Sequence, residues 1–340
     1  MKLYVQCNPL LDISAVVTED LMTKYSVGRA VAILMGNEQQ GIFEELEKKP
    51  DVKYVPGGSG LNTARVAQWI LQAPKGSFSM YVGCAADDRY GKILKESAEA
   101  DGVTMVLEYT KKEPTGSCAV CITGKERSLV ANLAAANHLS EEHMHSAEVQ
   151  KHLEEAKLFY LTSFTLTVNV NYVLHVAQKA RAVDGIFMMN LSAPFLIEFF
   201  GEQFNQVLPY VDVIFANEVE AHTLAKVKKW DAHNVPDITR RALQELPYSG
   251  TKNRLIVITQ GAHATVCATK DEVLEVPVPP LDTAKMVDLN GAGDAFVGGF
   301  LAAYALGRDL KCCCDAGHYA AQTVIQHSGC TYPEKPSITL

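Results

Sequence analysis

The stretch DLNGAGDAF, residues 288–296, combines a tight turn with the start of an apolar helix. Gly291 and Gly293 are poor helix formers, so they favour a turn that leads into AFVGGFLAAYALG. The first turn of a helix has unpaired N–H groups and attracts anions, and small residues let an anion approach the backbone. Asp294 then has two interpretations. It is an N-cap of its own helix, or it is a base aimed at a hydroxyl that attacks a bound phosphate.

The composition is that of a globular protein with a sizeable core, because 340 residues with 48% apolar side chains suffice for one large α/β domain or two unequal ones. A net charge of −8 argues against a nucleic-acid partner. We expect no membrane partner either, since Gln6 and Pro9 interrupt the amino-terminal segment and the longest apolar run, after Asp294, is too short to span a bilayer. Nine cysteines without framework spacing predict reduced thiols and a cytoplasmic location.

Two sequence patterns occur along the chain. From about residue 76 onward, short β-branched runs precede amphipathic helical stretches, which predicts an α/β fold with a doubly wound, mostly parallel central sheet flanked by helices. Residues 13–17, 30–34 and 116–133 read as strands without helices, so we expect a small β-rich lid. The predicted division assigns residues 1–12, 59–111 and 133–340 to the large domain, and residues 13–58 and 112–132 to the lid.

The phosphate chemistry is not that of the common nucleotide motifs. No GxxxxGK[ST] stretch occurs, which excludes a P-loop, and the protein-kinase motifs are absent. GGSGLNTARVAQWIL, residues 57–71, partly matches the dinucleotide fingerprint, because Gly58 and Gly60 fit its first two glycines. Thr63 occupies the third position, however, and no acidic strand end follows at the required distance. A nicotinamide- or flavin-dependent dehydrogenase is therefore a disfavoured alternative.

Two glycine-rich helix starts, residues 57–70 and 288–300, resemble the two signatures of the ribokinase family of sugar and nucleoside kinases. NPLLDISAVV (8–17) and CITGKERSLVANLAAAN (121–137) are similar to the members that phosphorylate adenosine. The resemblance implies a ribokinase-like fold and transfer of the γ-phosphoryl group of ATP to the 5′-hydroxyl of adenosine. It also implies Mg²⁺ as cofactor and a monomer that serves purine salvage. The alternatives are another nucleoside or sugar kinase of the same family, and a nucleoside-binding protein without catalysis.

The resemblance gives Asp294 the role of general base, so the N-cap and base interpretations can hold together. It implies that Gly291, Ala292, Gly293 and Asp294 offer backbone N–H groups to the transferring phosphoryl group. Arg127 matches a lid arginine that swings onto phosphate; by itself it would be a solvated hairpin charge.

The nucleoside contacts are implied by the resemblance as well. Asp12, which we expect to end a strand, would accept hydrogen bonds from the ribose 2′- and 3′-hydroxyls. Related kinases carry a lid Gln where this chain has Ala32, so the polar contact of that Gln is missing. The other expected substrate contacts are Asn8, Gly58, Ser59 and Asn62 around ribose, and Leu34, Leu129, Phe164 and Phe199 around adenine.

For the nucleotide, Asn217 and Glu220 match an NxxE motif that organises Mg²⁺ and its waters. Glu220 would act on the metal through bound water, and the bland alternative for it is a salt bridge at a helix start. The residues expected around ATP are Asn217, Glu220, Thr259, Gly261, Asn290 and His318.

Overall fold

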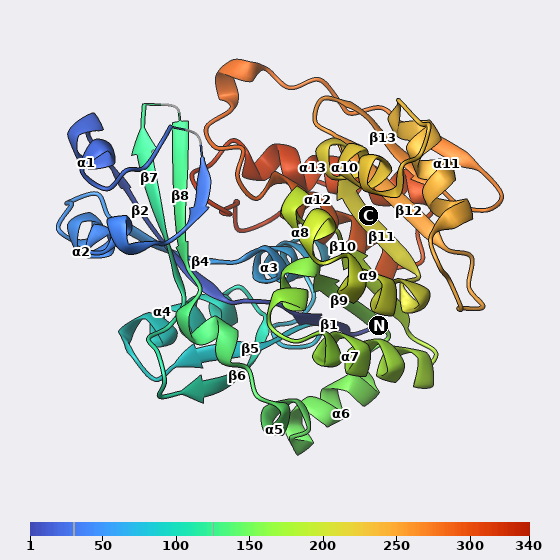
Figure 1. Ribbon diagram of the computed structural model, residues 1–340, viewed down its shortest axis with the longest axis horizontal. Coiled ribbons are helices and arrows are strands. Elements are labelled where there is room, and N and C mark those ends of the chain that lie inside the picture. The colour runs from blue at the N-terminus through green and yellow to red at the C-terminus, as the bar shows by residue number, and fades with distance from the viewer. Residues whose placement is uncertain (30, 125) are drawn as a thin grey trace.

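The computed structural model describes residues 1–29, 31–124 and 126–340, and these form two sheets (Figure 1). In the larger sheet, seven described strands run parallel, and two antiparallel strands extend one edge. The predicted α/β class with a mostly parallel central sheet is confirmed. The order across the sheet is β14 (Val273–Val276), β13 (His263–Ala268), β12 (Leu255–Gln260), β11 (Val213–Asn217), β10 (Ile186–Asn190), β9 (Leu158–Thr162), β1 (Leu3–Gln6), β5 (Ser79–Ala86) and β6 (Thr104–Thr110).

Helices cover both faces of this sheet because its strands are apolar on both sides. Leu3 and Val5 point into one core, and Tyr4 points into the other. Among the described residues no helix has the length and apolarity to cross a bilayer. The first core is closed by α3 (Ser59–Leu71), α4 (Arg89–Ala100), α12 (Ala292–Ala305) and α13 (Leu310–Val324). The second is closed by α5 (Glu141–Met144), α6 (Ala147–Glu155), α7 (Val170–Ala182), α8 (Pro194–Phe199), α9 (Gly201–Val207), α10 (Glu218–Lys228) and α11 (Val235–Glu245).

The smaller sheet stands beside the larger one, at the left of Figure 1. The strand expected at 30–34 is present as Ala32–Leu34, and Ala30 lies outside the described residues. The order is β3 (Ala32–Leu34), β8 (Glu126–Asn132), β7 (Ser117–Thr123), β2 (Leu10–Val16) and β4 (Lys53–Gly57), with the helices α1 (Glu19–Lys24) and α2 (Ile42–Glu47) beside it.

The expectation that Asp12 ends a strand is wrong. Asp12 is the third residue of β2, and it pairs with Val55 of β4 on one side and Cys118 of β7 on the other. Backbone pairing on both sides carries the strand past the carboxylate, whose side chain leaves the ladder untouched. Asp12 therefore belongs to the smaller sheet.

Candidate active site

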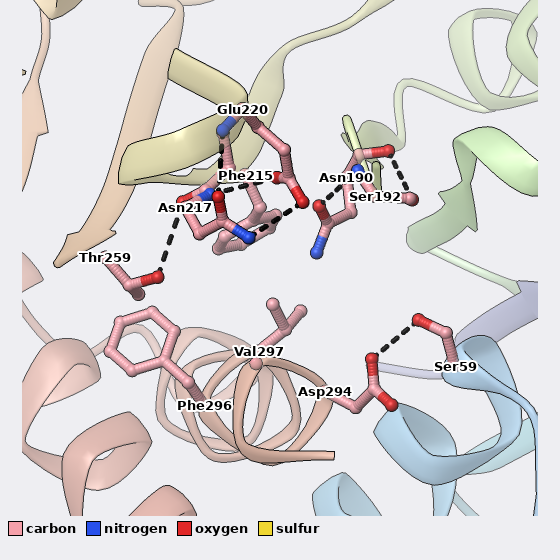
Figure 2. Close-up of a pocket in the computed structure, with 12 residues that line it drawn as sticks. Ser59, Asn190, Ser192, Phe215, Asn217, Glu220, Thr259, Asp294, Phe296 and Val297 are labelled. Atoms are coloured by element: carbon pink, nitrogen blue, oxygen red, sulfur yellow. Dashed lines mark hydrogen bonds between the residues drawn. The ribbon is translucent and has the colours of Figure 1, made fainter. Parts of the chain in front are cut away.

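The parallel strands end together at one edge of the larger sheet. β5 lies on one side of β1 and β9 on the other, so the order of the strands reverses beside β1. Ligands of open α/β sheets bind outside the carboxyl ends of the strands at such a point. A cavity of about 120 Å³ lies at this edge, against α12 (Figure 2). Its lining residues are Ser59, Asn190, Ser192, Phe215, Ala216, Asn217, Glu220, Thr259, Gly293, Asp294, Phe296 and Val297.

Asp294 is held by the start of a different helix. The N-cap of α12 is Gly291, whose φ of +76° lies in the left-handed region that favours glycine. The Asp294 carboxylate accepts hydrogen bonds from Ser59 Oγ at 2.6 Å and Asn62 Nδ2 at 3.0 Å, both on α3. The interpretation of Asp294 as the N-cap of α12 is therefore wrong, because Gly291 occupies that position and the Asp294 side chain bonds to α3 instead. The two glycine-rich helix starts meet at this carboxylate.

The Asp294 carboxylate has the electrostatics of a base that works near neutral pH. Burial raises its pKa to about 6, and the hydrogen bonds from Ser59 and Asn62 lower it. A general base is most effective when its pKa lies near the working pH. Asp294 is consequently ionised at neutral pH, yet it accepts a proton readily.

The backbone in front of Asp294 is open on the side of the cavity. At Gly293 there is nothing within 4 Å of the position that a Cβ would occupy, so a ligand can approach the chain there. The N–H of Ala292 donates to Leu289 O at 3.3 Å. Asn290 is not among the lining residues of the cavity, and both its backbone N and its Nδ2 donate to Asp288 Oδ1, at 3.0 and 2.9 Å.

Glu220 and Asn217 face Asp294 across the cavity (Figure 2). They form a capping box: Glu220 N donates to Asn217 Oδ1, and Asn217 donates through N and Nδ2 to the two Glu220 carboxylate oxygens, all at 2.9 Å. Glu220 thus caps α10 through hydrogen bonds, in place of the salt bridge considered as its alternative. Burial raises the pKa of Glu220 to about 7, although the bonds from Asn217 lower it.

Asn190 and Ser192 line the cavity, although the sequence predicted no role for either. Ser192 has a φ of +68°, which is strained for a residue with a Cβ. Asn190 Oδ1 accepts from Ser192 N at 2.9 Å, and Ser192 Oγ accepts from Ser163 N at 3.0 Å. An Asn at the carboxyl end of an apolar strand is the signal in the sequence that indicates this pair.

Arg127 reaches from β8 of the smaller sheet to the loop before α12. Its Nε lies 3.7 Å from Asp288 Oδ2, and both side chains are buried. Asp288 also accepts from Asn290 N and, at 2.9 Å, from Gly329 N. The interpretation of Arg127 as a solvated hairpin charge is therefore wrong. Asp288, which the sequence left without a role, joins the smaller sheet to the start of α12.

Gly57 and Gly58, which directly precede α3, are required by close packing. A Cβ on Gly57 would lie 2.2 Å from Asp12 Oδ1, and one on Gly58, whose φ is +88°, would lie 2.4 Å from Asn8 O. Gly58 is the N-cap of α3, so it fixes where this helix begins. Burial raises the pKa of the Asp12 carboxyl to about 7, against the lowering effect of Arg65.

Several predicted site residues lie outside the cavity lining. Leu34 and Phe199 are 65% and 77% exposed, and Leu129 and Phe164 are half-buried. His318 is buried, with Nε2 at 2.8 Å from Thr265 Oγ1. Gly261 occupies the turn between β12 and β13. Of the residues expected around ATP, those that line the cavity are Asn217, Glu220 and Thr259.

Comparison with known proteins places the chain among the kinases. The family profile described as pfkB family carbohydrate kinase matches residues 25–337. The chain belongs to the pfkB family of carbohydrate kinases. The resemblance that the two glycine-rich motifs predicted is thereby confirmed, and the matched residues include strands of both sheets, although β1 and β2 precede them.

Relatives of this pfkB-family chain are adenosine kinases. Adenosine kinase 1 of Arabidopsis thaliana is 45% identical over 97% of this chain and 95% of its own length. The apo structure of Trypanosoma brucei brucei adenosine kinase is 59% identical, with a TM-score of 0.93 over 96% of this chain and 99% of its own. Anopheles gambiae adenosine kinase, in complex with P1,P4-di(adenosine-5) tetraphosphate, is 43% identical, with a TM-score of 0.90 over 99% of this chain and 98% of its own.

Proposed function

We propose that this pfkB-family chain is an adenosine kinase that transfers the γ-phosphoryl group of ATP to the 5′-hydroxyl of adenosine and produces AMP and ADP. The near full-length similarity to adenosine kinases supports the substrate. The observation that best supports phosphoryl transfer is the position of the Asp294 carboxylate, which Ser59 and Asn62 of α3 hold beside a cavity lined by polar residues at the ends of strands. We further propose that the protein acts as a cytoplasmic monomer in purine salvage.

Asp294 acts as the general base in this proposal. Its carboxylate takes the proton of the adenosine 5′-hydroxyl, the hydroxyl oxygen forms a bond to the γ-phosphorus of ATP, and the bond to the β-phosphate oxygen breaks to release ADP. Ser59 and Asn62 hold the carboxylate for this step. Backbone N–H groups of residues 291–294 stabilise the charge on the transferring group, which needs fixed donors and little reorganisation.

The residues opposite Asp294 fit Mg²⁺, which prefers oxygen ligands and keeps several waters. Asn190, Asn217 and Glu220 bring amide and carboxylate oxygens to one wall of the cavity. Both Glu220 oxygens already accept from Asn217, so Glu220 would hold the ion through water. Bound there, the ion would neutralise charge on the ATP phosphates. Thr259, Asn290, Gly261 and His318 remain proposed neighbours of the nucleotide.

The smaller sheet acts as a lid over the nucleoside. Asp12, Asn8, Gly58 and the start of α3 surround ribose in this proposal. Closure of residues 13–58 and 112–132 brings Leu34 and Leu129 over adenine, against Phe164 and Phe199. The same movement carries Arg127 from Asp288 to the phosphates, and closing the site excludes water from the reaction.

The test is a substrate panel with Mg²⁺ and ATP, in which ADP formation is followed with adenosine, other nucleosides, ribose and fructose 6-phosphate. Adenosine should be the strongly preferred acceptor. Equal rates on ribose or fructose 6-phosphate would instead identify another sugar or nucleoside kinase of the family. A fluorescence titration with NAD(P) checks the dehydrogenase alternative, and we expect no binding.

A further inference from the structure

Arg65 is a buried cation in the second turn of α3. The residue is 4% exposed. Its Nε donates to Asp101 Oδ2 at 2.7 Å, and its Nη1 donates to the carbonyl oxygens of Pro56 at 2.8 Å and Cys330 at 3.1 Å. The ring of Tyr332 lies 5.7 Å from the guanidinium. A buried guanidinium is costly unless its donors are paired, so these contacts together fix its position.

These contacts join three segments that are distant in sequence. Pro56 belongs to β4 of the smaller sheet, Cys330 to the carboxyl-terminal segment, and Asp101 to the end of α4. The helix that carries Arg65 also carries Ser59 and Asn62, the two donors to Asp294. Helix α3 therefore holds the Asp294 carboxylate through its first turn, and through Arg65 in its second turn it binds the Pro56 carbonyl of the smaller sheet.

The hydrogen bond from Arg65 to the Pro56 carbonyl affects the position of the Asp12 side chain. In the β2–β4 ladder, Pro56 lies opposite Leu11, and Gly57 follows it. The Asp12 carboxylate packs on Gly57 so closely that a Cβ there would lie 2.2–2.4 Å from the carboxylate atoms. The position of the Pro56 carbonyl thus determines the wall against which the Asp12 carboxylate rests.

We propose that Arg65 is a positioning residue for the nucleoside: by binding the Pro56 carbonyl, it holds Gly57 against Asp12 and aims the Asp12 carboxylate at the ribose hydroxyls. This inference rests on the proposed function. Arg65 touches neither substrate in this role, and it acts through β4.

The charge of Arg65 serves the same end. Burial raises the pKa of Asp12 to about 7, Arg65 lowers it, and the negative charges of Asp294 and Asp288 raise it. The other titratable groups that face Asp12 are the thiols of Cys118 and Cys330; burial raises the pKa of both, that of Cys330 to about 12, so both stay neutral. An ionised carboxylate accepts hydrogen bonds from two hydroxyls, whereas a protonated one gives up part of that capacity.

The chain offers a matched control in Arg254. Arg254 is also 4% exposed, and it donates to the carbonyls of Leu246, Pro247 and Leu208 at 2.9–3.1 Å. It directly precedes β12, at the amino end of the strand, while the cavity lies at the carboxyl ends. Substitution of Arg254 therefore reports what the loss of a buried arginine does to folding alone.

The experiment compares Arg65→Lys and Arg65→Gln with Arg254→Lys and Arg254→Gln, by steady-state kinetics from pH 5.5 to 9 and by thermal unfolding. Arg65→Gln should raise the KM for adenosine about tenfold, because a hydrogen bond from a charged donor holds β4. It should leave the KM for ATP unchanged and move the acidic limb of kcat/KM for adenosine to higher pH. Arg65→Lys keeps the charge, so its KM should rise while its acidic limb stays in place.

A second readout separates positioning from folding. In an Asp12→Ala background, Arg65→Lys and Arg65→Gln should add no further rise in the KM for adenosine, because the residue through which Arg65 acts is gone. The inference is overturned if Arg65→Lys lowers the Tm as Arg254→Lys does but leaves the KM for adenosine at the wild-type value. It is overturned equally if the effects of Arg65 and Asp12 add in full. If wild-type protein does not phosphorylate adenosine, the proposed function fails instead.

Discussion

The two ends of the candidate site are assembled to different degrees. At the end proposed to hold the phosphates (the phosphate end), Ser59 Oγ donates to Asp294 Oδ1 at 2.6 Å, and Asn217 and Glu220 form a capping box. At the end proposed to hold the nucleoside (the nucleoside end), the side chains of Leu34 and Phe199 are 65% and 77% exposed. The difference follows from where the residues lie. Helix starts and strand ends of one sheet are fixed by the fold, whereas Leu34 lies on β3 of the smaller sheet and Phe199 at the end of α8 beside the larger sheet.

In the proposed mechanism, the exposed side chains of Leu34 and Phe199 would supply a driving force for closure of the lid. Burying an apolar side chain of the size of Leu or Phe contributes about 1.5–3 kcal/mol. Two such residues against an adenine ring would offset the ordering of the lid, and the Arg127 contact with Asp288 would be exchanged for phosphate. The proposed mechanism therefore combines a preformed phosphate end with a nucleoside end that forms on binding.

The sharpest test of the preformed end is Asp294→Asn. The substitution keeps the shape and removes the base, so kcat should fall by roughly 10²–10⁴ while the affinity for adenosine changes little. The matched control is Asp309→Asn, because Asp309 caps α13 by accepting from Cys312 N at 2.8 Å. Rates of ADP formation at saturation measure both. If the two variants keep similar kcat values, Asp294 is a structural carboxylate only.

The unassembled end is tested by amide hydrogen exchange with each substrate alone. Adenosine should protect residues 13–57 and 112–132, because it fills the space between the lid and the large domain. ATP alone should leave these segments unchanged. Leu34→Ala should weaken the protection and the binding of adenosine by up to about tenfold, while Val16→Ala, also exposed in the smaller sheet, should do neither. Equal protection by both substrates would show that the lid does not respond to the nucleoside.

The features that the sequence could predict are those set by short local patterns of residues. The alternation of β-branched runs and helical stretches is a local pattern, so it predicted β5 and β9–β12, and the two glycine-rich motifs predicted the starts of α3 and α12. The β7–β8 hairpin was predicted from the strand runs at 116–133. The cavity-lining residues Ser59, Asn217, Glu220, Thr259 and Asp294 were all named in advance through motifs that span a few residues.

What the sequence could not predict depends on contacts between distant segments. Arg127 and Asp288 meet across 161 positions, and no local pattern indicates their pairing. The sequence predicts Gly58 as a ribose contact, but not that glycine is required there by the close approach of the Asn8 carbonyl oxygen, which lies on a distant segment. The contact of Arg65 with β4 could not be predicted either, because nothing in the sequence around an arginine within a helix indicates that its side chain is buried.

The smallest expected effect is on the free energy of unfolding. It measures the cost of holding the Asp294 carboxylate buried before any ligand binds. Burial raises the pKa of Asp294 from its usual 3.8 to about 6. Between these values Asp294 binds more proton in the folded state than in the unfolded chain, so its favourable contribution to stability is fully present below about pH 4 and is lost as the pH rises through about 6. The ionised carboxylate therefore lowers the free energy of unfolding at pH 8 by an amount on the order of 1–3 kcal/mol.

Asp294→Asn removes that charge and keeps the local hydrogen bonds. Asn62 Oδ1 is buried and has no hydrogen-bond partner among the described residues, so a flip of the Asn62 amide lets it accept from the new Nδ2. The variant should be more stable than wild type at pH 8 by about 1–3 kcal/mol, and the gain should disappear by pH 4. Urea unfolding at the two pH values measures it, with Asp309→Asn as the control that gains nothing. A gain that is absent at pH 8 would mean that the Asp294 carboxylate is well solvated, and the phosphate end would then need closure as much as the nucleoside end does.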